Sequence, residues 1–335
     1  MHAFQLGGFV VSFGRVHGGG SPPCTLPFLY DGSVDPFVDY HGRPLRSLRL
    51  SVPDCCNFRC TYCVPEKEYK WLPKAEILSL IIELEDVALT TNAFLLATQA
   101  ADLHAAGLQR LNISLDTLKR ERFHKLTQRD ALAEVLEGIR IAGEVGFRGT
   151  KIDTVMMRGQ NDDEIIDLLE FSAANDLKLR FIEYMDVGGA TQWSESQVLE
   201  RDVILERVET HYGAIEALKP YNLAAPARIY RLNNGIEFGI IASTTTPFCG
   251  ECDRSRIAAD GTWFSCLYAN HGVDLRELLR NGDDDQQLAV AIADLWRARN
   301  DRGAEDRKAQ VQRGPAVDLE DLLADTRLEM HTRGG

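Results

Sequence analysis

The sequence predicts an α/β fold built around a parallel sheet, with a smaller region appended after about residue 220. Up to residue 186, short segments with strand patterns alternate with segments of helical spacing, which is typical of parallel βα units. Beyond residue 220 the strands come first and the helices follow. The chain has 335 residues, of which 44% are hydrophobic and 26% charged. That is enough for one large domain or two ordinary ones.

The individual elements follow from local patterns. The predicted strands of the first part are LRLSV (48–52), DVALTT (86–91), LQRLNISLD (108–116), KIDTVMM (151–157) and LKLRFIEYMD (177–186). Predicted helices cover 130–145, which Gly146 ends, and 161–176, which begins with acidic capping residues. In the appended region, ARIYRL and EFGIIAST predict strands, and 273–281 and 285–299 predict helices. Catalytic residues in parallel sheets lie at the carboxyl ends of strands, where we expect the site.

Composition and charge exclude several classes of protein. No run of about 18 apolar residues exists, so no membrane span is expected. The net charge of −13 and the pI of about 5.1 argue against a broad nucleic-acid surface, although a few local cations can still bind a small anion. Residues 1–42 hold one Arg and no Lys, unlike a signal or transit peptide. We therefore expect a loose tail there and a cytoplasmic, reducing location.

Six of the eight cysteines form two triplets, and in a reducing compartment such clusters indicate a metal site. Three thiolates per site suit a [4Fe–4S] cluster that leaves one iron open to bind and activate a ligand. The alternative is a zinc site shared by two Cys-x2-Cys pairs, Cys60 with Cys63 and Cys249 with Cys252. Cys24 and Cys55 are left over and are expected to be ordinary thiols. The triplets are Cys56, Cys60 and Cys63, directly after the first predicted strand, and Cys249, Cys252 and Cys266.

The residues around the cysteines carry a family resemblance. CNFRCTYC resembles the signature of radical S-adenosylmethionine enzymes. The wider stretches resemble, in the same order, one family within that superfamily, the GTP 3',8-cyclases of molybdenum cofactor biosynthesis. The resemblance covers residues from about 40 to 335, and it favours iron–sulfur clusters over zinc. The stretches are LRLSVPDCCNFRCTYCVPE, ALTTNA, LNISLDTL, VMMRGQNDDEI, RFIEYMDVGG, FCGECDRSRIAADGTWFSCL and the final MHTRGG.

The resemblance implies a fold and a reaction. The fold is an open, partial (β/α) barrel of the radical S-adenosylmethionine type over residues 43–220, with a C-terminal cluster-binding region and glycine tail over 221–335. One [4Fe–4S] cluster would reduce S-adenosylmethionine to yield a 5'-deoxyadenosyl radical. That radical would take hydrogen from C3' of GTP, whose sugar carbon then attacks C8 to give 3',8-cyclo-7,8-dihydro-GTP. The second [4Fe–4S] cluster would hold the guanine. The implied partners are an electron donor, a downstream cyclic pyranopterin monophosphate synthase and a second copy of the chain in a homodimer.

The resemblance also assigns residues. Tyr62, Ser114 and Met185 match positions that contact S-adenosylmethionine, although each is explained equally by packing, and Met185 better so. Lys151 and Arg180 interrupt apolar strands, which is unusual unless they face a polar cavity. Guanidinium groups suit phosphate oxygens because their paired donors match them. The glycine tail enters the active site in the family, but a frayed end is the ordinary alternative. The matches to GTP-binding positions are Arg49, Thr90, Lys151, Arg180, Arg254 and Arg256, and those to catalytic positions are Arg49, Gly334 and Gly335.

One family segment is missing. Between the first cysteine loop and ALTTN, the family has a helix, a strand ending in Gly-Gly-Glu-Pro and another helix, whereas residues 74–85 allow one helix. The barrel is thus short by about one βα unit, roughly 30 residues. The absent motif grips the amino group of S-adenosylmethionine, and the absent strand carries basic residues for the triphosphate. We expect either a gap in the sheet or direct pairing of strand 48–52 with strand 86–91. Ala93 also replaces a family glycine, and Cys55 a usual arginine.

Three interpretations therefore remain open. The chain is a GTP cyclase whose activity the missing segment impairs, or a non-catalytic iron–sulfur relic that acts as a scaffold. A zinc-stabilised structural protein is the more distant third. Iron and sulfide content distinguishes the third from the others, and turnover of S-adenosylmethionine distinguishes the first from the second.

Overall fold

The computed structural model describes residues 38–51, 56–63, 87–220, 222–280 and 285–333, and the backbone of residues 10–13. The predictions for Cys24, Cys55, the helix at 74–85, Gly334 and Gly335 lie outside the described residues. No helix among the described residues is long and apolar enough to cross a membrane.

The predicted elements that lie in the described residues are found, with ends that differ by a few residues, and the structure adds others that were not predicted. The strands are β1 (Val10–Phe13), β2 (Ser47–Ser51), β3 (Val87–Thr91), β4 (Arg110–Ser114), β5 (Lys151–Met156), β6 (Lys178–Glu183), β7 (Ile215–Ala217), β8 (Arg228–Leu232), β9 (Glu237–Ile241), β10 (Arg254–Ile257), β11 (Thr262–Phe264) and β12 (Val273–Asp274). The α-helices are α1 (Leu96–Ala105), α2 (Arg120–Thr127), α3 (Leu132–Val145), α4 (Ile165–Ala174), α5 (Arg201–Tyr212), α6 (Leu275–Arg280), α7 (Asp285–Arg297), α8 (Gly303–Lys308) and α9 (Leu319–Ala324). Short 3-10 turns include η4 (Cys249–Glu251) and η6 (His331–Arg333). The elements that were not predicted include β1, β7, β10, β11, β12, α2, α5, α8 and α9.

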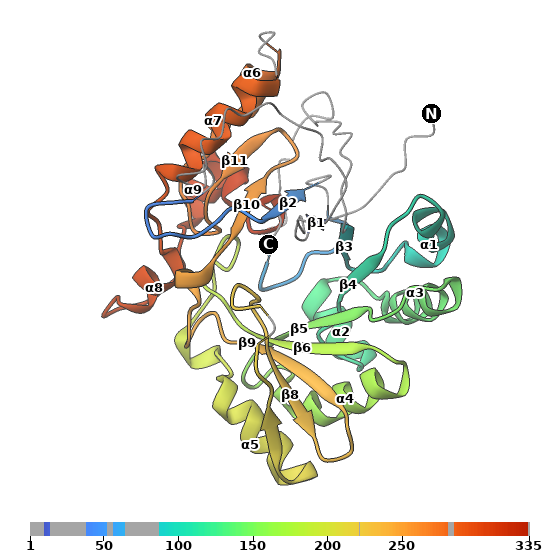
Figure 1. Ribbon diagram of the computed structural model, residues 1–335. Helices are drawn as coiled ribbons and strands as arrows, with labels where there is room; N and C mark the ends of the chain where they lie inside the picture. Colours follow the sequence, from blue (N-terminus) through green and yellow to red (C-terminus); the bar gives the residue numbers. More distant parts are fainter. Residues whose placement is uncertain are drawn as a thin grey trace.

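All twelve strands form one curved sheet, in the order β12-β11-β10-β2-β1-β3-β4-β5-β6-β9-β8-β7. Strands β3, β4, β5, β6 and β9 are parallel, as the alternation of strands and helices predicted. The sheet is open, because β12 and β7 are its two edges within the described part of the chain. Helices α1, α2 and α3 lie on one side of the molecule, and α6, α7 and α9 lie beside β10 and β11 (Figure 1). The predicted α/β fold is confirmed.

The inner strands divide their side chains between a core and a cavity. Leu111 and Ile113 on β4, Ile152 on β5 and Phe181 on β6 are fully buried in the main hydrophobic core. Their neighbours in sequence, such as Asn112, line a cavity on the other face. Successive residues of a strand point to opposite faces, so strands that alternate apolar and polar residues place the polar set together.

The position beside β2 differs from both predicted arrangements. Neither a gap nor direct pairing of β2 with β3 is found, because β1 lies between them and is antiparallel to both. The tail of residues 1–42, predicted to be loose, thus contributes a strand to the centre of the sheet. The same tail contributes Asp39, which is buried. Patterns of apolar spacing could not reveal β1, because an isolated four-residue strand carries too little periodicity.

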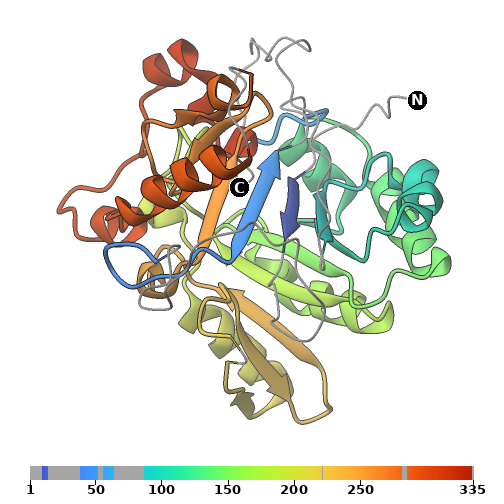
Figure 2. The same cartoon turned by 45° about the horizontal axis from the view of Figure 1, so that its top comes forward.

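Strands β2 and β10 connect the two ends of the chain. They pair in parallel, with Arg49 opposite Arg256 and Ser47 opposite Arg254. Two main-chain bonds from Arg46 and Ser47 to the carbonyl oxygen of Asp253, each 3.1 Å long, support the start of this pair. In Figure 2 the blue strand β2 lies between the orange strand β10 and the dark blue strand β1. The C-terminal region is therefore part of the same sheet as the N-terminal strands.

Ala93, which stands where the family has glycine, has a left-handed backbone conformation. Ala93 has a φ of 59° and is completely buried. A side chain costs roughly 1–2 kcal/mol in this conformation. The family glycine implies that this position needs backbone freedom, and in this chain an alanine adopts the left-handed conformation under strain.

We expect Ala93→Gly to change the free energy of unfolding by less than about 1 kcal/mol. Relief of the left-handed strain, roughly 1–2 kcal/mol, offsets the loss of a buried methyl group, about 0.8 kcal/mol, and the greater freedom of glycine in the unfolded chain. The matched control is Ala88→Gly on β3, where the alanine is equally buried but has no positive φ. There nothing offsets the losses, so urea unfolding should show a decrease of about 1–2 kcal/mol. Equal losses in both variants would contradict strain at Ala93.

Candidate active site

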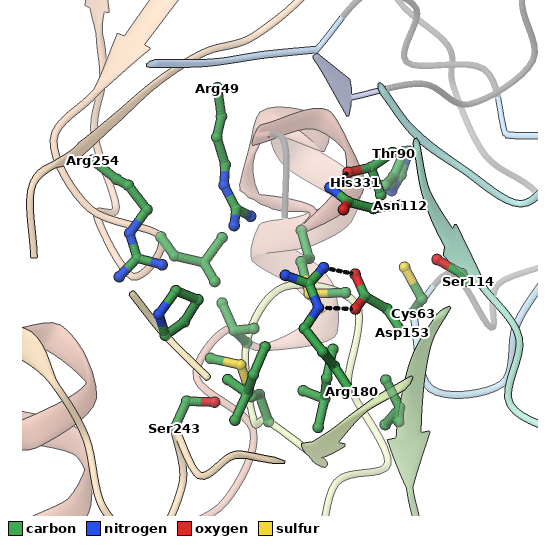
Figure 3. A pocket seen from close by; sticks show the side chains of 18 of the residues that line it. Arg49, Cys63, Thr90, Asn112, Ser114, Asp153, Arg180, Ser243, Arg254 and His331 are labelled. Carbon is green, nitrogen blue, oxygen red and sulfur yellow. Dashed lines mark hydrogen bonds and ion pairs between the residues drawn. The ribbon is translucent and has the colours of Figure 1, made fainter. Parts of the chain in front are cut away.

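Both cysteine triplets line one cavity of about 970 Å³, although they lie far apart in the sequence. Every described residue that the sequence assigned to the site also lines it. Figure 3 shows the guanidinium groups of Arg49, Arg254 and Arg180 pointing toward the middle of this space. Besides the six cysteines, the cavity is lined by Arg49, Tyr62, Thr90, Ser114, Lys151, Arg180, Met185, Arg254 and Arg256.

The first cysteine loop rests on helix α2 through its backbone. The amides of Arg59 and Thr61 donate to the carbonyl oxygens of Thr127 and Leu126, both at 2.9 Å. Phe58 fills the space below the loop and is buried in the main core. The loop therefore has a fixed course even though its cysteines face a cavity.

The thiols of this loop lie close enough to affect each other. Burial raises the pKa of Cys60 well above its usual value, and the neighbouring Cys56 raises it further. Burial and Cys60 have the same effect on the pKa of Cys63. Three crowded thiolates favour a positively charged ligand, because a metal centre removes their mutual repulsion.

Gly189, in the stretch RFIEYMDVGG, allows a second segment to approach this loop. A Cβ atom at Gly189 would lie 1.7 Å from the carbonyl oxygen of Cys63. Only a residue without a side chain fits there. The loop after β6, which also carries Met185, is thereby held against the first cysteine loop.

The second triplet has a different electrostatic environment. Burial would raise the pKa of Cys252, but Arg254 and Arg299 outweigh it and lower that pKa to about 6. An Nη atom of Arg254 lies 3.6 Å from the sulfur of Cys252. Burial and the carboxylate of Asp301 raise the pKa of Cys266 to about 11. One thiol of this triplet is thus prepared to be an anionic ligand before any metal binds.

The cysteines fit iron–sulfur ligation better than a single zinc ion. All six cysteines are free thiols. Among the residues that the structure describes, no three Cys, His, Asp or Glu side chains converge closely enough to hold a single metal ion. Zinc needs its sulfur ligands at about 2.3 Å from one centre. In an iron–sulfur cluster each cysteine binds its own iron, so the sulfurs need not converge on one point.

Four arginines gather beside the cysteines. Burial lowers the pKa of Arg49 well below its usual value, and Arg256, Arg254 and Arg180 lower it further. Burial and Arg254 lower the pKa of Arg256 to about 10. Arg254 and Arg256 are both buried, and among the described residues neither Nε atom has a hydrogen-bond partner. Buried cations that repel one another, two of them with an unpartnered Nε atom, indicate a site for an anion.

Arg180 is already partly engaged. Its guanidinium forms a two-fold bond with the carboxylate of Asp153, with both distances 2.5 Å (Figure 3). The pair is mostly buried between β5 and β6, where the two residues are directly opposite. Asp153 fixes the direction of Arg180 and leaves one Nη atom outside the two-fold bond. The sequence did not single out Asp153, although its alternation along KIDTVMM placed it on the same face as Lys151.

The structure adds further residues to the site. Tyr62 donates a short hydrogen bond to Asp116, whose other oxygen accepts the amide of Val155 at 2.8 Å. Burial raises the pKa of Asp116 to about 6. Asn112 lies beside Thr90, with its amide nitrogen 3.3 Å from the Thr90 hydroxyl. Asp116 and Asn112 lie within the quoted stretch LNISLDTL, so the signal was present but was not assigned to these positions.

The C-terminal tail reaches the cavity. Met330 and His331 line it, and the hydroxyl of Ser51 donates to the carbonyl oxygen of His331 at 3.2 Å. The buried Arg333 holds the tail by donating to the carbonyl oxygens of Leu267 and Ala269 at 2.9 and 2.6 Å. The last described residues are thus fixed beside the second triplet. The roles of Gly334 and Gly335 remain a prediction.

Known proteins resemble this chain over nearly its whole length. Residues 71–172 match the Radical SAM superfamily, and residues 177–305 match the family Molybdenum Cofactor Synthesis C. GTP 3',8-cyclase 1 of Mycobacterium tuberculosis is 45% identical over 93% of this chain and 99% of its own length. GTP 3',8-cyclase of Staphylococcus carnosus is 34% identical over 83% of this chain and 95% of its own.

The chain belongs to the GTP 3',8-cyclase family. The resemblance stated from the sequence is therefore confirmed, as are the radical S-adenosylmethionine class of the fold and the assignment to an enzyme family of molybdenum cofactor biosynthesis. Family membership also implies S-adenosylmethionine and an iron–sulfur cluster. A solved structure titled as TYW1 with a lysine-pyruvate adduct bound has a TM-score of 0.29 and covers 39% of the chain.

The alignment with the mycobacterial family member bears on the missing segment. It extends over 356 positions, more than the 335 residues of this chain, so it includes positions that this chain lacks. The match to the radical S-adenosylmethionine superfamily begins at residue 71 and thus excludes the first cysteine triplet. The assignment of individual site residues stays a prediction.

We expect Arg256→Ala to weaken GTP binding about tenfold or more, because a charge-assisted hydrogen bond contributes about 1.5–3 kcal/mol. Binding should also weaken with salt, since the site concentrates positive charge in an acidic chain. Titration calorimetry of the anaerobic protein measures both effects. The control is Arg120→Ala, which removes an exposed arginine paired with Asp130 outside the cavity. Equal affinity in the wild type and in the Arg254/Arg256 double alanine variant would exclude these residues from the site.

The raised pKa of Asp116 predicts a pH dependence of stability. Because the folded pKa of about 6 exceeds the ordinary value of 3.8, the folded state binds the proton more tightly. The stabilisation of the folded state by protonated Asp116 is therefore greatest below about pH 4 and is lost as the pH rises to about 6. In the protein without metal, the free energy of unfolding of the wild type relative to Asp116→Asn should fall by about 3 kcal/mol between pH 4 and pH 7. A constant difference in urea unfolding would show that Asp116 titrates normally.

Proposed function

We propose that the chain converts GTP to 3',8-cyclo-7,8-dihydro-GTP with S-adenosylmethionine and two [4Fe–4S] clusters, at the start of molybdenum cofactor biosynthesis. The observation that carries the proposal is the shared cavity, in which two cysteine triplets flank a group of buried arginines. A cluster triplet alone is compatible with many reactions. The combination with a polyanion site in a member of this family favours a nucleoside triphosphate as the substrate.

The S-adenosylmethionine side of the cavity is formed by the first triplet and its neighbours. Tyr62 lies inside that triplet, and its bond to Asp116 fixes its ring relative to strand β5. Ser114 ends strand β4, and Met185 follows strand β6. In our proposal these residues contact the cofactor, which binds the open iron of the first cluster. When bound, the cluster and S-adenosylmethionine supply the electron and the carbon radical that start the reaction.

Strands β2, β3, β5 and β10 form the part of the cavity that would hold GTP. Arg49, Arg254 and Arg256 would bind the triphosphate, since all three line the cavity and the buried Nε atoms of Arg254 and Arg256 have no hydrogen-bond partner among the described residues. Lys151 on β5 and Thr90 on β3 line the same space. The second triplet, next to Arg254 and Arg256, would hold a cluster whose open iron binds the guanine. This arrangement would direct the ribose of GTP toward the first triplet.

The protein residues would bind GTP, orient it and enclose it. The arginines would neutralise the triphosphate, and Asp153 would keep Arg180 in place while they do so. The tail at Met330 and His331 would exclude water from the ribose. Enclosure of the ribose matters because it prevents side reactions at the reacting carbon.

The missing segment limits the expected rate. The strand that carries the Gly-Gly-Glu turn in the family runs parallel to its neighbours, whereas β1 runs antiparallel. The two strands therefore present opposite ends to the cavity, and β1 does not restore that turn. Loose binding of S-adenosylmethionine follows, and misplacement by about 1 Å costs on the order of a hundredfold in rate.

The test is an anaerobic assay of the reconstituted chain with dithionite, GTP and S-adenosylmethionine. We expect about eight irons per chain, four for each cluster, together with slow formation of 5'-deoxyadenosine that depends on GTP. A second protein carries a family-like helix–strand–helix segment inserted between Leu80 and Glu85, and should turn over faster. Cys60→Ala in the first triplet is the negative control. It should remove cleavage of S-adenosylmethionine while the iron of the other triplet remains.

Two outcomes favour the alternatives. Eight irons without 5'-deoxyadenosine in either protein would support the non-catalytic relic. Tightly bound zinc without iron uptake would support the structural zinc protein. Equal rates in the two proteins would show that the missing strand is dispensable. A cyclic pyranopterin monophosphate synthase that consumes the product, an external electron donor and a homodimer are further parts of our proposal.

A further inference from the structure

A buried group of charged residues contacts the main chain of the second triplet. We call Asp39, Arg43 and Arg299 the Asp39 clamp. All three are buried, with 6%, 2% and 4% of their surfaces exposed. Asp39 and Arg43 lie just before strand β2, and Arg299 follows helix α7. The proposed reaction assigns no role to any of them.

Arg43 connects the clamp to the first cysteine of the triplet. Its Nε atom donates to Asp39 at 2.6 Å, and one Nη atom donates to the carbonyl oxygen of Cys249 at 2.9 Å. The other Nη atom is buried and has no hydrogen-bond partner among the described residues. The backbone of Arg43 is fixed as well, because the indole of Trp296 donates to its carbonyl oxygen at 2.9 Å.

Arg299 makes the equivalent contact with the second cysteine. One Nη atom donates to the carbonyl oxygen of Cys252 at 2.9 Å and lies 3.7 Å from Asp39. Its Nε atom donates to Asp301 at 3.1 Å, and Asp301 accepts the hydroxyl of Ser265 at 2.7 Å. Ser265 precedes Cys266. The guanidinium also lies over the ring of Trp296. Arg299 is thus linked to the main chain of one ligating cysteine and to the neighbour of another.

Stability alone is a weak reason for this arrangement. Buried ion pairs cost much desolvation and are often replaced by apolar residues without loss. The clamp also leaves one buried donor without an acceptor, which is unfavourable. What it does achieve is geometric, because the two guanidinium groups beside Asp39 each donate to a carbonyl oxygen of the Cys249–Cys252 turn. Residues behind metal ligands act in this way when they orient the ligands.

We propose that Arg43 and Arg299 are positioning residues for the second cluster, held by Asp39, which keep Cys249 and Cys252 in the geometry for ligation. The inference rests on the proposed second cluster. Arg299 has an additional effect, because it places a positive charge next to the thiolates and balances the carboxylate of Asp301. Its loss should therefore lower the reduction potential as well as weaken ligation.

The experiment uses the full chain with Cys56, Cys60 and Cys63 changed to Ala, so that iron reports on the second triplet alone. Arg43→Met and Arg299→Met are expected to lose iron to a chelator about 10–100 times faster than the parent. A redox titration followed by electron paramagnetic resonance should show a more negative potential for Arg299→Met. The matched control is Arg297→Met, two residues away, which removes an exposed arginine paired with Asp294. It should behave as the parent does.

A second pair of variants keeps the charge and removes the fork. One ammonium group cannot make the divergent contacts of a guanidinium. Arg43→Lys and Arg299→Lys should therefore lose iron faster than the parent, with the potential almost unchanged in Arg299→Lys. If the Met variants do not fold, the Lys variants still test the proposal. Iron loss and potentials equal to those of Arg297→Met would overturn the clamp and leave the second cluster intact. Absence of iron from the parent would overturn the second cluster and the clamp together.

Discussion

The parallel pairing of β2 with β10 is the interaction on which the site depends. It places Arg49 opposite Arg256 and brings the second cysteine triplet beside strands from the start of the chain. Like charges directly opposite each other in a sheet repel, and here they are also buried. An anion between the two arginines would offset this repulsion, which supports the proposed binding of GTP at this pair of strands.

This concentration of charge contrasts with the chain as a whole, whose net charge is −13. Several exposed arginines form pairs with carboxylates, such as Arg120 with Asp130 and Arg140 with Glu137. In the cavity, Arg180 pairs with Asp153, whereas the buried Nε atoms of Arg254 and Arg256 have no hydrogen-bond partner among the described residues. An acidic exterior around a basic cavity agrees with the small polyanion of our proposal.

The two cysteine triplets are built in different ways, which suits two different tasks. The first triplet has thiols with raised pKa values and lies in a loop that rests on α2. Gly189 lets the loop after strand β6 approach it. The second lies next to arginines on one side and the Asp39 clamp on the other. Between β2 and β3, the antiparallel β1 preserves the continuity of the sheet. However, β1 is not the parallel strand whose end would hold S-adenosylmethionine. The sheet is therefore continuous although the proposed cofactor site is incomplete.

The sequence by itself determined the strand and helix order, the two triplets and the family, because alternating patterns and cysteine spacing are local properties. It also identified Arg49, Lys151, Arg180, Arg254 and Arg256, which the structure brings to one cavity. Only the tertiary structure decided the position of β1, the carboxylate partner of Arg180, the bond from Tyr62 to Asp116 and the Asp39 clamp. Each of these joins residues from different segments, and their contacts depend on strand register and on how the ends of the chain pack. Neither leaves a periodic signal in the sequence.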